Sequence, residues 1–400
     1  MNPRFYFDHA ASSPMVPACR TAFEAYDRAP WAGANPNSLH TSGRCAFEAL
    51  EQARAGIARA LGARRPAEVV FTSGGTEANN LAMAGIAHAA LRKSGGTRRR
   101  VLVFALEHDS VLDPAAALGI SDTMDVERVP SLPSGTVDLA ALERALSHDV
   151  ALVSVMAANN EVGTVQPLAD VVRLAHGCGA LVHTDAVQAF GHIPLCVSDL
   201  DVDAASVAAH KMGGPVGIGA LYLKSRTPLL PLQLGGGQEG GLRSGTPDVR
   251  SAMGFAAAAA DAVENLASRR AKIERLASVL VDSLCAGPAP VAMPTVDAPR
   301  DGRFLPGVLH LLVPGHQTEG LVLSLDELGY EVSGGSACSS GSLDPSHVLL
   351  AMGVPRDLAF CALRLSFDHR TDESECTGLA AALREICSTQ PQRQRRRPRC

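Results

Sequence analysis

The sequence contains no run of about 18 apolar residues, the length that a membrane-spanning helix needs. Its first residues also lack the basic and apolar regions of a signal peptide. An excess of positive charge is missing too, because 36 basic residues stand against 41 acidic ones, for a net charge of −5. These absences argue against a membrane protein and against a protein that binds nucleic acid or anionic membranes. We expect a cytoplasmic protein.

Closely spaced cysteines are absent as well, since neighbouring members of the set of ten lie at least 11 positions apart. This spacing excludes the C-x-x-C pairs of zinc ribbons and thioredoxin-like redox motifs, and we predict no metal site. In a reducing cytosol most of these thiols should be small, buried apolar residues.

The chain is rich in apolar residues, which make up 46% of its 400 positions and suffice for a large core. Short apolar runs alternate with segments long enough for helices, which is the rhythm of βαβ units. The runs cover residues 68–72, 101–105, 151–156, 180–184 and 204–208. Their near-continuous apolar character is typical of strands buried on both faces. We therefore predict an α/β fold with a mostly parallel sheet.

A helical pattern over about 248–285 predicts a long helix that leads into a second unit. We expect a large domain over residues 16–262 and a small α/β domain formed by residues 1–15 and 263–388. The remaining tail, 389–400, carries five arginines and no apolar period, so it should be disordered.

Polar residues follow each of the five predicted strands. Because ligands of open α/β sheets bind beyond the carboxyl ends of the strands, these side chains should meet in one crevice. They are residues 73–76, Glu107 and His108, 159–161, Asp185 and Gln188, and His210 and Lys211.

Several of these groups fit one cofactor. Gly75 and Thr76 offer backbone amides and a hydroxyl to a phosphate, Asp185 is a carboxylate that needs a positive partner, and Lys211 is suited to a Schiff base. Taken one at a time, each group has an ordinary structural explanation. Gly75 and Thr76 could form a tight turn, Asp185 could cap a helix, and Lys211 could extend to solvent. Together they predict pyridoxal phosphate, with His108 stacked on its ring. No G-x-G-x-x-G follows a strand, which argues against a dinucleotide site.

Cys338 is the cysteine with unusual surroundings, because the other nine residues of the segment 333–342 are all small. None of them can hold the thiol in a core, so we expect an exposed, mobile loop. The thiol is then either accidental or a reagent that is carried to a substrate.

The order of these motifs resembles that of the cysteine desulfurases, pyridoxal-phosphate enzymes of the class V aminotransferase group. The resemblance covers nearly the whole chain and ends at about residue 388. It rests on residues 6–11, 35–38, 73–80, 159–163, 183–188, 210–211, 243–246, 335–338 and 364–366. It implies the aspartate aminotransferase-like fold, with the cofactor in the large domain and the Cys338 loop in the small one.

The resemblance also implies a role for each site residue. Lys211 holds the cofactor covalently, Asp185 pairs with its ring nitrogen, and His108 stacks on the ring and moves protons. The phenolic oxygen of the ring is contacted by Asn160 and Gln188. The phosphate is bound by Gly75, Thr76, His210 and, from the other subunit of a homodimer, Thr246. The substrate carboxylate is bound by Arg364, helped by Asn35.

The implied reaction converts L-cysteine to L-alanine and leaves the sulfur on Cys338 as a persulfide. The Cys338 loop resembles that of the family branch with a long mobile loop, which delivers sulfur to acceptor proteins for iron-sulfur clusters, tRNA thiolation or another thio-cofactor. Three alternatives stay open. They are a cysteine or selenocysteine lyase, another class V aminotransferase-type enzyme, and a sulfur-trafficking or scaffold protein that has lost catalysis.

Two positions depart from the family pattern. Ala208 stands where a serine usually binds the phosphate, and Gly240 stands where the G-G-G-x-E-R-G motif has its arginine. The first change removes a phosphate contact and predicts weaker cofactor retention, by about 1 to 2 kcal/mol for one lost hydrogen bond. The second predicts a looser loop near the dimer interface.

Overall fold

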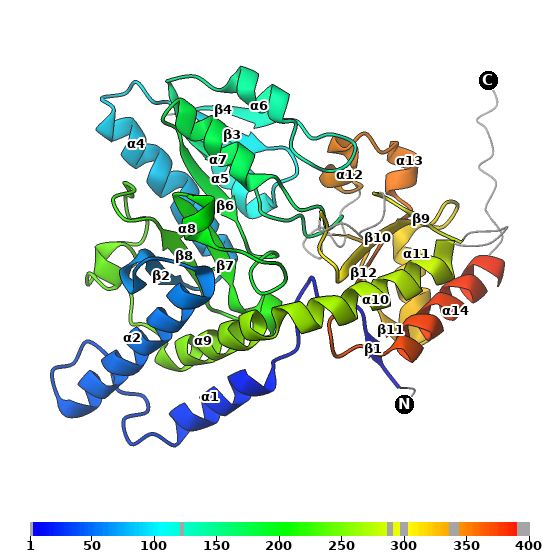
Figure 1. Cartoon of the computed structure of the whole chain (residues 1–400), viewed down its shortest axis with the longest axis horizontal. Helices are drawn as coiled ribbons and strands as arrows, with labels where there is room; N and C mark the ends of the chain where they lie inside the picture. Colours follow the sequence, from blue (N-terminus) through cyan, green and yellow to red (C-terminus); the bar gives the residue numbers. More distant parts are fainter. Residues whose placement is uncertain (1–2, 121–123, 286–290, 297–302, 336–343, 390–400) are drawn as a thin grey trace.

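The computed structural model describes residues 3–120, 124–285, 291–296, 303–335 and 344–389 (Figure 1). It confirms the α/β fold, because its main element is a seven-stranded sheet in the order β2-β8-β7-β6-β5-β3-β4. β8 is antiparallel to both of its neighbours, and the other pairs are parallel. The strands are β2 (Val69–Thr72), β3 (Arg100–Phe104), β4 (Asp125–Val129), β5 (Val150–Ser154), β6 (Leu181–Asp185), β7 (Ala204–Ala208) and β8 (Gly219–Leu223).

The five predicted runs correspond to β2, β3, β5, β6 and β7, with ends that differ by at most two residues. The sequence analysis missed β4, which lies at the edge of the sheet. Three of its five residues, Asp125, Glu127 and Arg128, are charged and exposed. The strand therefore lacks the apolar run by which the other strands were predicted.

Helices cover both faces of this sheet (Figure 1). Successive residues of β3 face opposite layers: Val101 and Val103 pack with α3, η2 and α5, whereas Leu102 and Phe104 belong to the core that includes α2, α7 and α9. These helices are α1 (Pro17–Asp27), α2 (Thr41–Leu61), α3 (Gly75–Asn80), the π-helix η2 (Leu81–Ile86), α4 (Ala87–Lys93), α5 (Asp109–Ile120), α6 (Leu139–Ala145), α7 (Leu168–Gly177), α8 (Val197–Leu200) and α9 (Val249–Glu264). Short 3-10 turns are η1 (Pro66–Glu68), η3 (Ala209–Met212) and η4 (Glu239–Gly241).

The helical pattern expected over 248–285 forms two helices, because α9 ends at Asn265 and α10 spans Leu266–Cys285. Asn265 has non-helical angles (φ −100°, ψ 7°), and its side-chain amide donates to the carbonyl oxygen of Asp261. Asparagine competes for backbone hydrogen bonds in this way at helix ends. In Figure 1, α10 leads from the large sheet to a second group of strands, as expected.

This second group is antiparallel β9 (Met293–Pro294), β10 (Val308–Leu312) and β12 (Ala362–Ser366), together with the parallel pair β1 (Phe5–Tyr6) and β11 (Tyr330–Glu331). The remaining helices are α11 (Thr318–Glu327), α12 (His347–Ala351), α13 (Arg356–Ala359) and α14 (Glu373–Thr389). Phe7 and Phe367 belong to the core that β10, β12, α10 and α14 share. Another core joins Val308 and Leu312 of β10 to the large sheet, so the domain limits stay a prediction.

None of the helices in the described part of the chain is long and apolar enough to cross a membrane.

Candidate active site

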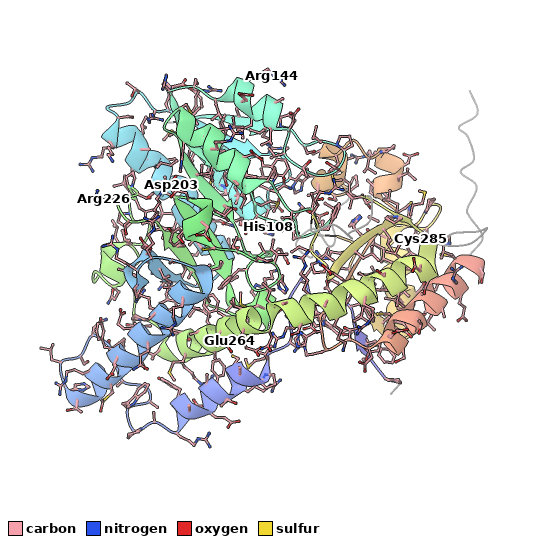
Figure 2. The ribbon with its side chains drawn as sticks, in the orientation of Figure 1. His108, Arg144, Asp203, Arg226, Glu264 and Cys285 are labelled. Atoms are coloured by element: carbon pink, nitrogen blue, oxygen red, sulfur yellow. The ribbon has the colours of Figure 1, made fainter. Side chains whose placement is uncertain are left out.

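A cavity of about 230 Å³ opens at the carboxyl ends of the parallel strands. Each of the five strand ends contributes at least one residue to its lining, whereas Ser73, Gly74, Glu107, Asn159 and Glu161, which the sequence analysis also expected there, do not line it. Those that line it are Gly75, Thr76, His108, Asn160, Asp185, Gln188, His210, Lys211 and Arg364. Figure 2 places His108 between the large sheet and the second group of strands. The cavity therefore lies where the two groups of strands face each other.

Lys211 lies in η3, the turn that directly follows β7. Its Nζ donates to the carbonyl oxygens of Ala10 (2.8 Å) and Ala11 (2.9 Å) in the N-terminal segment. Gly213 ends the turn with a φ of +84°, and a Cβ there would lie 2.5 Å from Val16 Cγ1. Only glycine fits this position without strain, so the backbone holds the amine in the cavity.

Asp185 is the last residue of β6 and is 6% exposed. Its Oδ1 accepts from the backbone N–H of Val187 (2.9 Å), and its Oδ2 accepts from Asn79 Nδ2 (2.7 Å). Both donors are uncharged, so a cationic group in the cavity would supply the opposite charge that a buried carboxylate needs. The sequence analysis missed Asn79, although it lies within the 73–80 motif.

His108 is linked to Asp185 through two further side chains. Asn79 Nδ2 lies 2.8 Å from Ser110 Oγ, and Ser110 Oγ lies 2.9 Å from His108 Nδ1. The backbone N–H of Ser110 also donates to His108 Nδ1 (3.0 Å). Because Nδ1 accepts this bond, a neutral His108 carries its proton on Nε2. Ser110, which the sequence analysis also missed, thus sets the tautomer of the imidazole.

The end of the cavity near β7 offers donors for a phosphate. Gly75 begins α3, and a Cβ on it would lie 2.7 Å from Val187 Cγ2, so only glycine allows this close approach. His210 Nδ1 lies 3.2 Å from Ser12 Oγ. Burial, followed by the neighbouring charge of Lys211, lowers the pKa of His210 to about 4. The imidazole is therefore neutral at pH 7 and can donate one N–H.

Arg364 of β12 enters the cavity from the opposite side and is 1% exposed. Its Nη2 pairs with Asp8 Oδ1 at 2.8 Å, and its Nη1 donates to the carbonyl oxygen of Asn160 at 3.0 Å. Its Nε is buried and has no hydrogen-bond partner among the described residues. A guanidinium with an unused donor beside the cavity can bind the carboxylate of a ligand. The carboxylate of Asp8, which already pairs with Arg364, would compete with that ligand.

Gln188 and the backbone near Asn160 frame the middle of the cavity. Gln188 Nε2 donates to the carbonyl oxygen of Ala10 (2.8 Å), the same oxygen that Lys211 contacts. The N-terminal segment therefore fixes an amide and the amine together, a role that the sequence analysis did not assign to it.

Asn35 and Thr246 do not line this cavity. Both are exposed, and Thr246 lines a separate pocket with Ser73 and Arg243. The described chain alone does not bring them to the other site residues.

Cys338 lies outside the described residues, as does most of the loop predicted over 333–342, of which only residues 333–335 are described. The described residues that flank this segment contact Glu161, the neighbour of Asn160. Ser346 Oγ donates to Glu161 Oε2 (2.5 Å), and a Cβ on Gly335 would lie 3.2 Å from the same oxygen. Both flanks are therefore held beside the cavity.

The two departures from the family pattern lie in different surroundings. Ala208 is 2% exposed and lines the cavity, so a missing hydroxyl there faces the ligand space. Gly240 has a φ of +64° in η4, where the preceding Glu239 pairs with Arg54 (2.5 Å) and accepts from the backbone N–H of Phe71 (2.8 Å). Glu239 thus anchors this loop. The predicted effects of both departures stay predictions.

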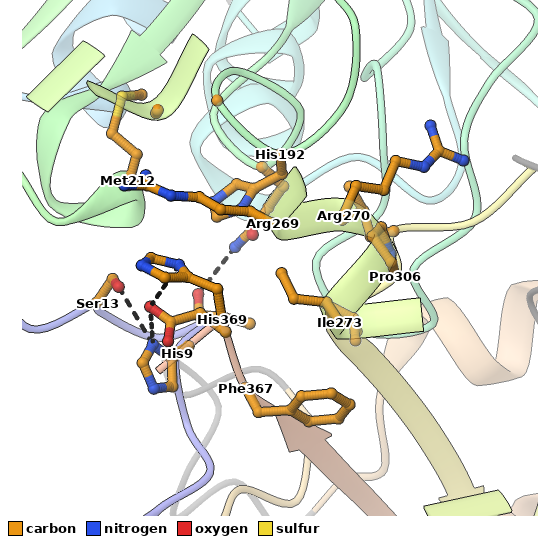
Figure 3. Close-up of a pocket in the computed structure, with 18 of the residues that line it drawn as sticks. His9, Ser13, His192, Met212, Arg269, Arg270, Ile273, Pro306, Phe367 and His369 are labelled. Atoms are coloured by element: carbon orange, nitrogen blue, oxygen red, sulfur yellow. Dashed lines mark hydrogen bonds and ion pairs between the residues drawn. The ribbon is translucent and has the colours of Figure 1, made fainter. Parts of the chain in front are cut away.

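A second, smaller cavity of about 60 Å³ lies behind the turn of Lys211 (Figure 3). His9, His192 and His369 line it, and His192 Nε2 lies 3.1 Å from the carbonyl oxygen of Lys211. Burial lowers the pKa of all three histidines, that of His9 to about 4. Of the three, His192 contacts the backbone of Lys211 from this cavity.

Comparison with known proteins points to the class V aminotransferases and, within them, to cysteine desulfurases. The model of the family "Aminotransferase class-V" matches residues 5–379. The chain is 45% identical over 372 residues to an "IscS-like cysteine desulfurase" of Mycobacterium tuberculosis, which covers 92% of this chain and 93% of that protein. It is 37% identical over 375 residues to "Cysteine desulfurase IscS" of Dictyoglomus turgidum, covering 94% and 92%.

Two solved structures extend the comparison. A "NIFS-LIKE PROTEIN" superposes with a TM-score of 0.86 at 35% identity, over 97% of this chain and all of that chain. "SspA in complex with cysteine" superposes with a TM-score of 0.77 at 31% identity, over 90% and 98%.

Proposed function

The chain belongs to the class V aminotransferase family and is a cysteine desulfurase, and we propose that it works with pyridoxal phosphate held in the cavity around Lys211. The observation that carries this proposal is that the Lys211 amine and the Asp185 carboxylate line one cavity together with His108. When bound, the cofactor supplies an aldehyde that condenses with amines and a protonated ring that takes up electrons.

The residues present fit this cofactor. Lys211 would hold the aldehyde, and its free amine would move the proton of the substrate Cα. Asp185 would hold the positive ring nitrogen, since Asn79 and Val187 fix the carboxylate. His108 would stack on the ring and exchange protons through Nε2, the nitrogen that Ser110 leaves protonated.

Gly75, Thr76 and His210 would bind the phosphate, and Asn160 and Gln188 would contact the phenolic oxygen. Arg364 binds the substrate carboxylate, with Asn35 as helper. Asp8 pairs with Arg364 in the protein without ligand. The substrate carboxylate must therefore either share Arg364 with Asp8 or displace Asp8 from it.

The sulfur leaves through Cys338. Its thiolate attacks the substrate sulfur, a sulfur–sulfur bond forms, and the carbon–sulfur bond of the substrate breaks. The electron pair stays on the carbon, which takes up protons and leaves as alanine, so Cys338 carries a persulfide. Ser346, a described residue after the segment that carries Cys338, donates to Glu161, the neighbour of the cavity residue Asn160, which supports this proposal. The persulfide then passes to an acceptor protein, as expected for iron-sulfur cluster assembly or a thiolation pathway.

A homodimer would complete the site, with Thr246 of one copy on the phosphate in the other. Its support is an apolar surface near Thr246. Gln233, which pairs with Ser244 through its backbone, is flanked by the exposed Leu232 and Leu234. Val216, next to the Gly217 that lines the Thr246 pocket, is 76% exposed. Large exposed side chains of this kind mark interaction surfaces. The cytoplasmic location stays a prediction from the sequence.

The test is product analysis with L-cysteine and added pyridoxal phosphate. The wild type should form alanine and protein-bound persulfide. Cys338→Ala should form neither, whereas Cys45→Ala, which removes a partly exposed thiol on α2, should keep both. Pyruvate and ammonia that survive in Cys338→Ala would indicate a lyase, and turnover of selenocysteine alone would indicate a selenocysteine lyase. A protein that stays colourless with cofactor would indicate a scaffold.

A further inference from the structure

Four polar side chains form a row beneath the floor of the cavity. Glu107 follows β3, and Ser154, His183 and Ser206 lie on the neighbouring strands β5, β6 and β7. All four have no exposed surface. Ser154 Oγ lies 3.4 Å from Glu107 Oε1 and 2.9 Å from His183 Nδ1, and His183 Nε2 lies 3.0 Å from Ser206 Oγ. A row of this kind in an apolar sheet needs an explanation.

The carboxyl of Glu107 has poor surroundings for a negative charge. Among the described residues, Oε2 is buried without a hydrogen-bond partner, and the Ser154 hydroxyl lies 3.4 Å from Oε1. The backbone N–H of Met156 also interacts with this carboxyl. A bare carboxylate oxygen in the interior costs several kcal/mol, whereas an unpartnered oxygen of a neutral acid costs far less.

A second carboxylate, Asp185, lies close by. It is two residues after His183 on β6, so both side chains leave the same face of the strand. Asp185 receives two good hydrogen bonds, from Asn79 and Val187, whereas Glu107 receives none of comparable quality. When two buried carboxyls share a region, the worse solvated one takes the proton. Burial, and then the charge of Asp185, raises the pKa of Glu107 well above its usual value.

We propose that Glu107 is a neutral carboxylic acid and a positioning residue, which leaves the negative charge on Asp185 to face the ring nitrogen of the cofactor. The part that concerns the ring rests on the proposed function, whereas the protonation of Glu107 does not.

A protonated Glu107 is consistent with a single direction of hydrogen bonds along the row. Glu107 Oε1–H donates to Ser154 Oγ, Ser154 Oγ–H donates to His183 Nδ1, and His183 Nε2–H donates to Ser206 Oγ. Every proton has an acceptor in this order. His183 stays neutral, because burial lowers its pKa to about 3. In the opposite order Ser154 Oγ–H would donate to Glu107 Oε1, and the acid proton would have to lie on Oε2, where the described residues offer it no acceptor.

Infrared spectra of the full-length protein test the protonation directly, before and after addition of pyridoxal phosphate. A protonated carboxyl has a separate C=O band that shifts in heavy water. Wild type should have such a band at pH 7, and Glu107→Gln should lose it. Glu161 is the matched control, because it is also buried, and Glu161→Gln should keep the band that Glu107→Gln loses. If Glu107→Gln loses no band, the proposal is wrong.

A second measurement covers the case that Glu107→Gln fails to fold. In Glu161→Gln protein labelled with ¹³C-glutamate, the band of a remaining protonated glutamate should move, and an unmoved band would contradict the proposal. Because these spectra do not need bound cofactor, they stand even if the proposed function fails.

The effect on the cofactor is read from its absorption as a function of pH. Since glutamine imitates a neutral glutamic acid, Glu107→Gln should leave the midpoint of this titration unchanged. Loss of an ionised Glu107 next to Asp185 would instead shift the midpoint by about 1 unit or more. Such a shift would overturn the proposal.

Discussion

The inner part of the candidate site and its rim differ in one respect. A single chain brings the residues of the inner part together in the cavity, but it does not do so for the residues of the rim. The inner part consists of Lys211, Asp185 and His108, whose positions are fixed by hydrogen bonds to Ala10, Asn79 and Ser110. The proposed rim consists of Asn35, Thr246 and Cys338. The first two are exposed and do not line the cavity, and the third lies outside the described residues. The described chain thus brings together the residues proposed to hold the cofactor, whereas the proposed roles of the rim residues depend on parts that it does not show.

The largest effect should come from loss of the inner amine. Lys211→Ala should lower the rate of alanine formation by on the order of 10³-fold or more, because it removes both the covalent anchor and the base. Lys224→Ala removes a surface amine that pairs with Asp201 and should leave the rate unchanged. Both rates can be measured from alanine release. A fully active Lys211→Ala would refute the assignment of the inner part.

A smaller effect is expected at Arg364, between the inner part and the rim. Arg364→Lys keeps the charge but loses the planar pair of donors, which is worth roughly 1.5 to 3 kcal/mol. The KM for L-cysteine should therefore rise by roughly 10-fold or more, with a smaller change in kcat. Arg370→Lys, at an arginine that binds Asp368 instead, is the control. A change in kcat alone would speak against a carboxylate receptor.

The buried framework should also make stability depend on pH. Burial lowers the pKa of His183 and of His310 to about 3, whereas both would titrate near 6.5 in an unfolded chain. The folded state then binds fewer protons, so the free energy of unfolding should fall as the pH drops from about 6.5 toward 3. The expected slope is about 1.4 kcal/mol per pH unit for each histidine.

Urea unfolding at several pH values measures this slope. His310→Gln should reduce it by the share of one histidine, and His148→Gln, at an exposed position, should not. Equal slopes for all three proteins would show that the buried histidines do not control the pH dependence.

The smallest effect concerns Ala208. Ala208→Ser should return a hydroxyl to the cavity wall and tighten cofactor binding about 5- to 10-fold, the equivalent of about 1 kcal/mol for one hydrogen bond. Thr246→Ala should weaken cofactor binding, provided that a second copy supplies Thr246. Equilibrium titration with pyridoxal phosphate gives both values. An Ala208→Ser variant that binds no more tightly would mean that another group already replaces the serine.

The sequence predicted the strands and the residues at their ends, because buried parallel strands are continuous apolar runs and their ligand-facing residues follow directly. It did not predict Asn79 or Ser110, since their contacts join α3 to α5 and depend on how these helices pack. Nor did it predict the pair of Arg364 and Asp8, which are 356 positions apart and meet only in the fold. The sequence did not predict β4, because an edge strand tolerates exposed charged residues and so need not be an apolar run.

The central claim is that Lys211 is the residue that binds the cofactor. The sequence has four lysines, at positions 93, 211, 224 and 272, so chemical trapping can distinguish them. Reduction of the protein with borohydride after addition of pyridoxal phosphate, followed by peptide mapping, should place the adduct on Lys211. An adduct on Lys93, Lys224 or Lys272, or no adduct at all, would contradict the account.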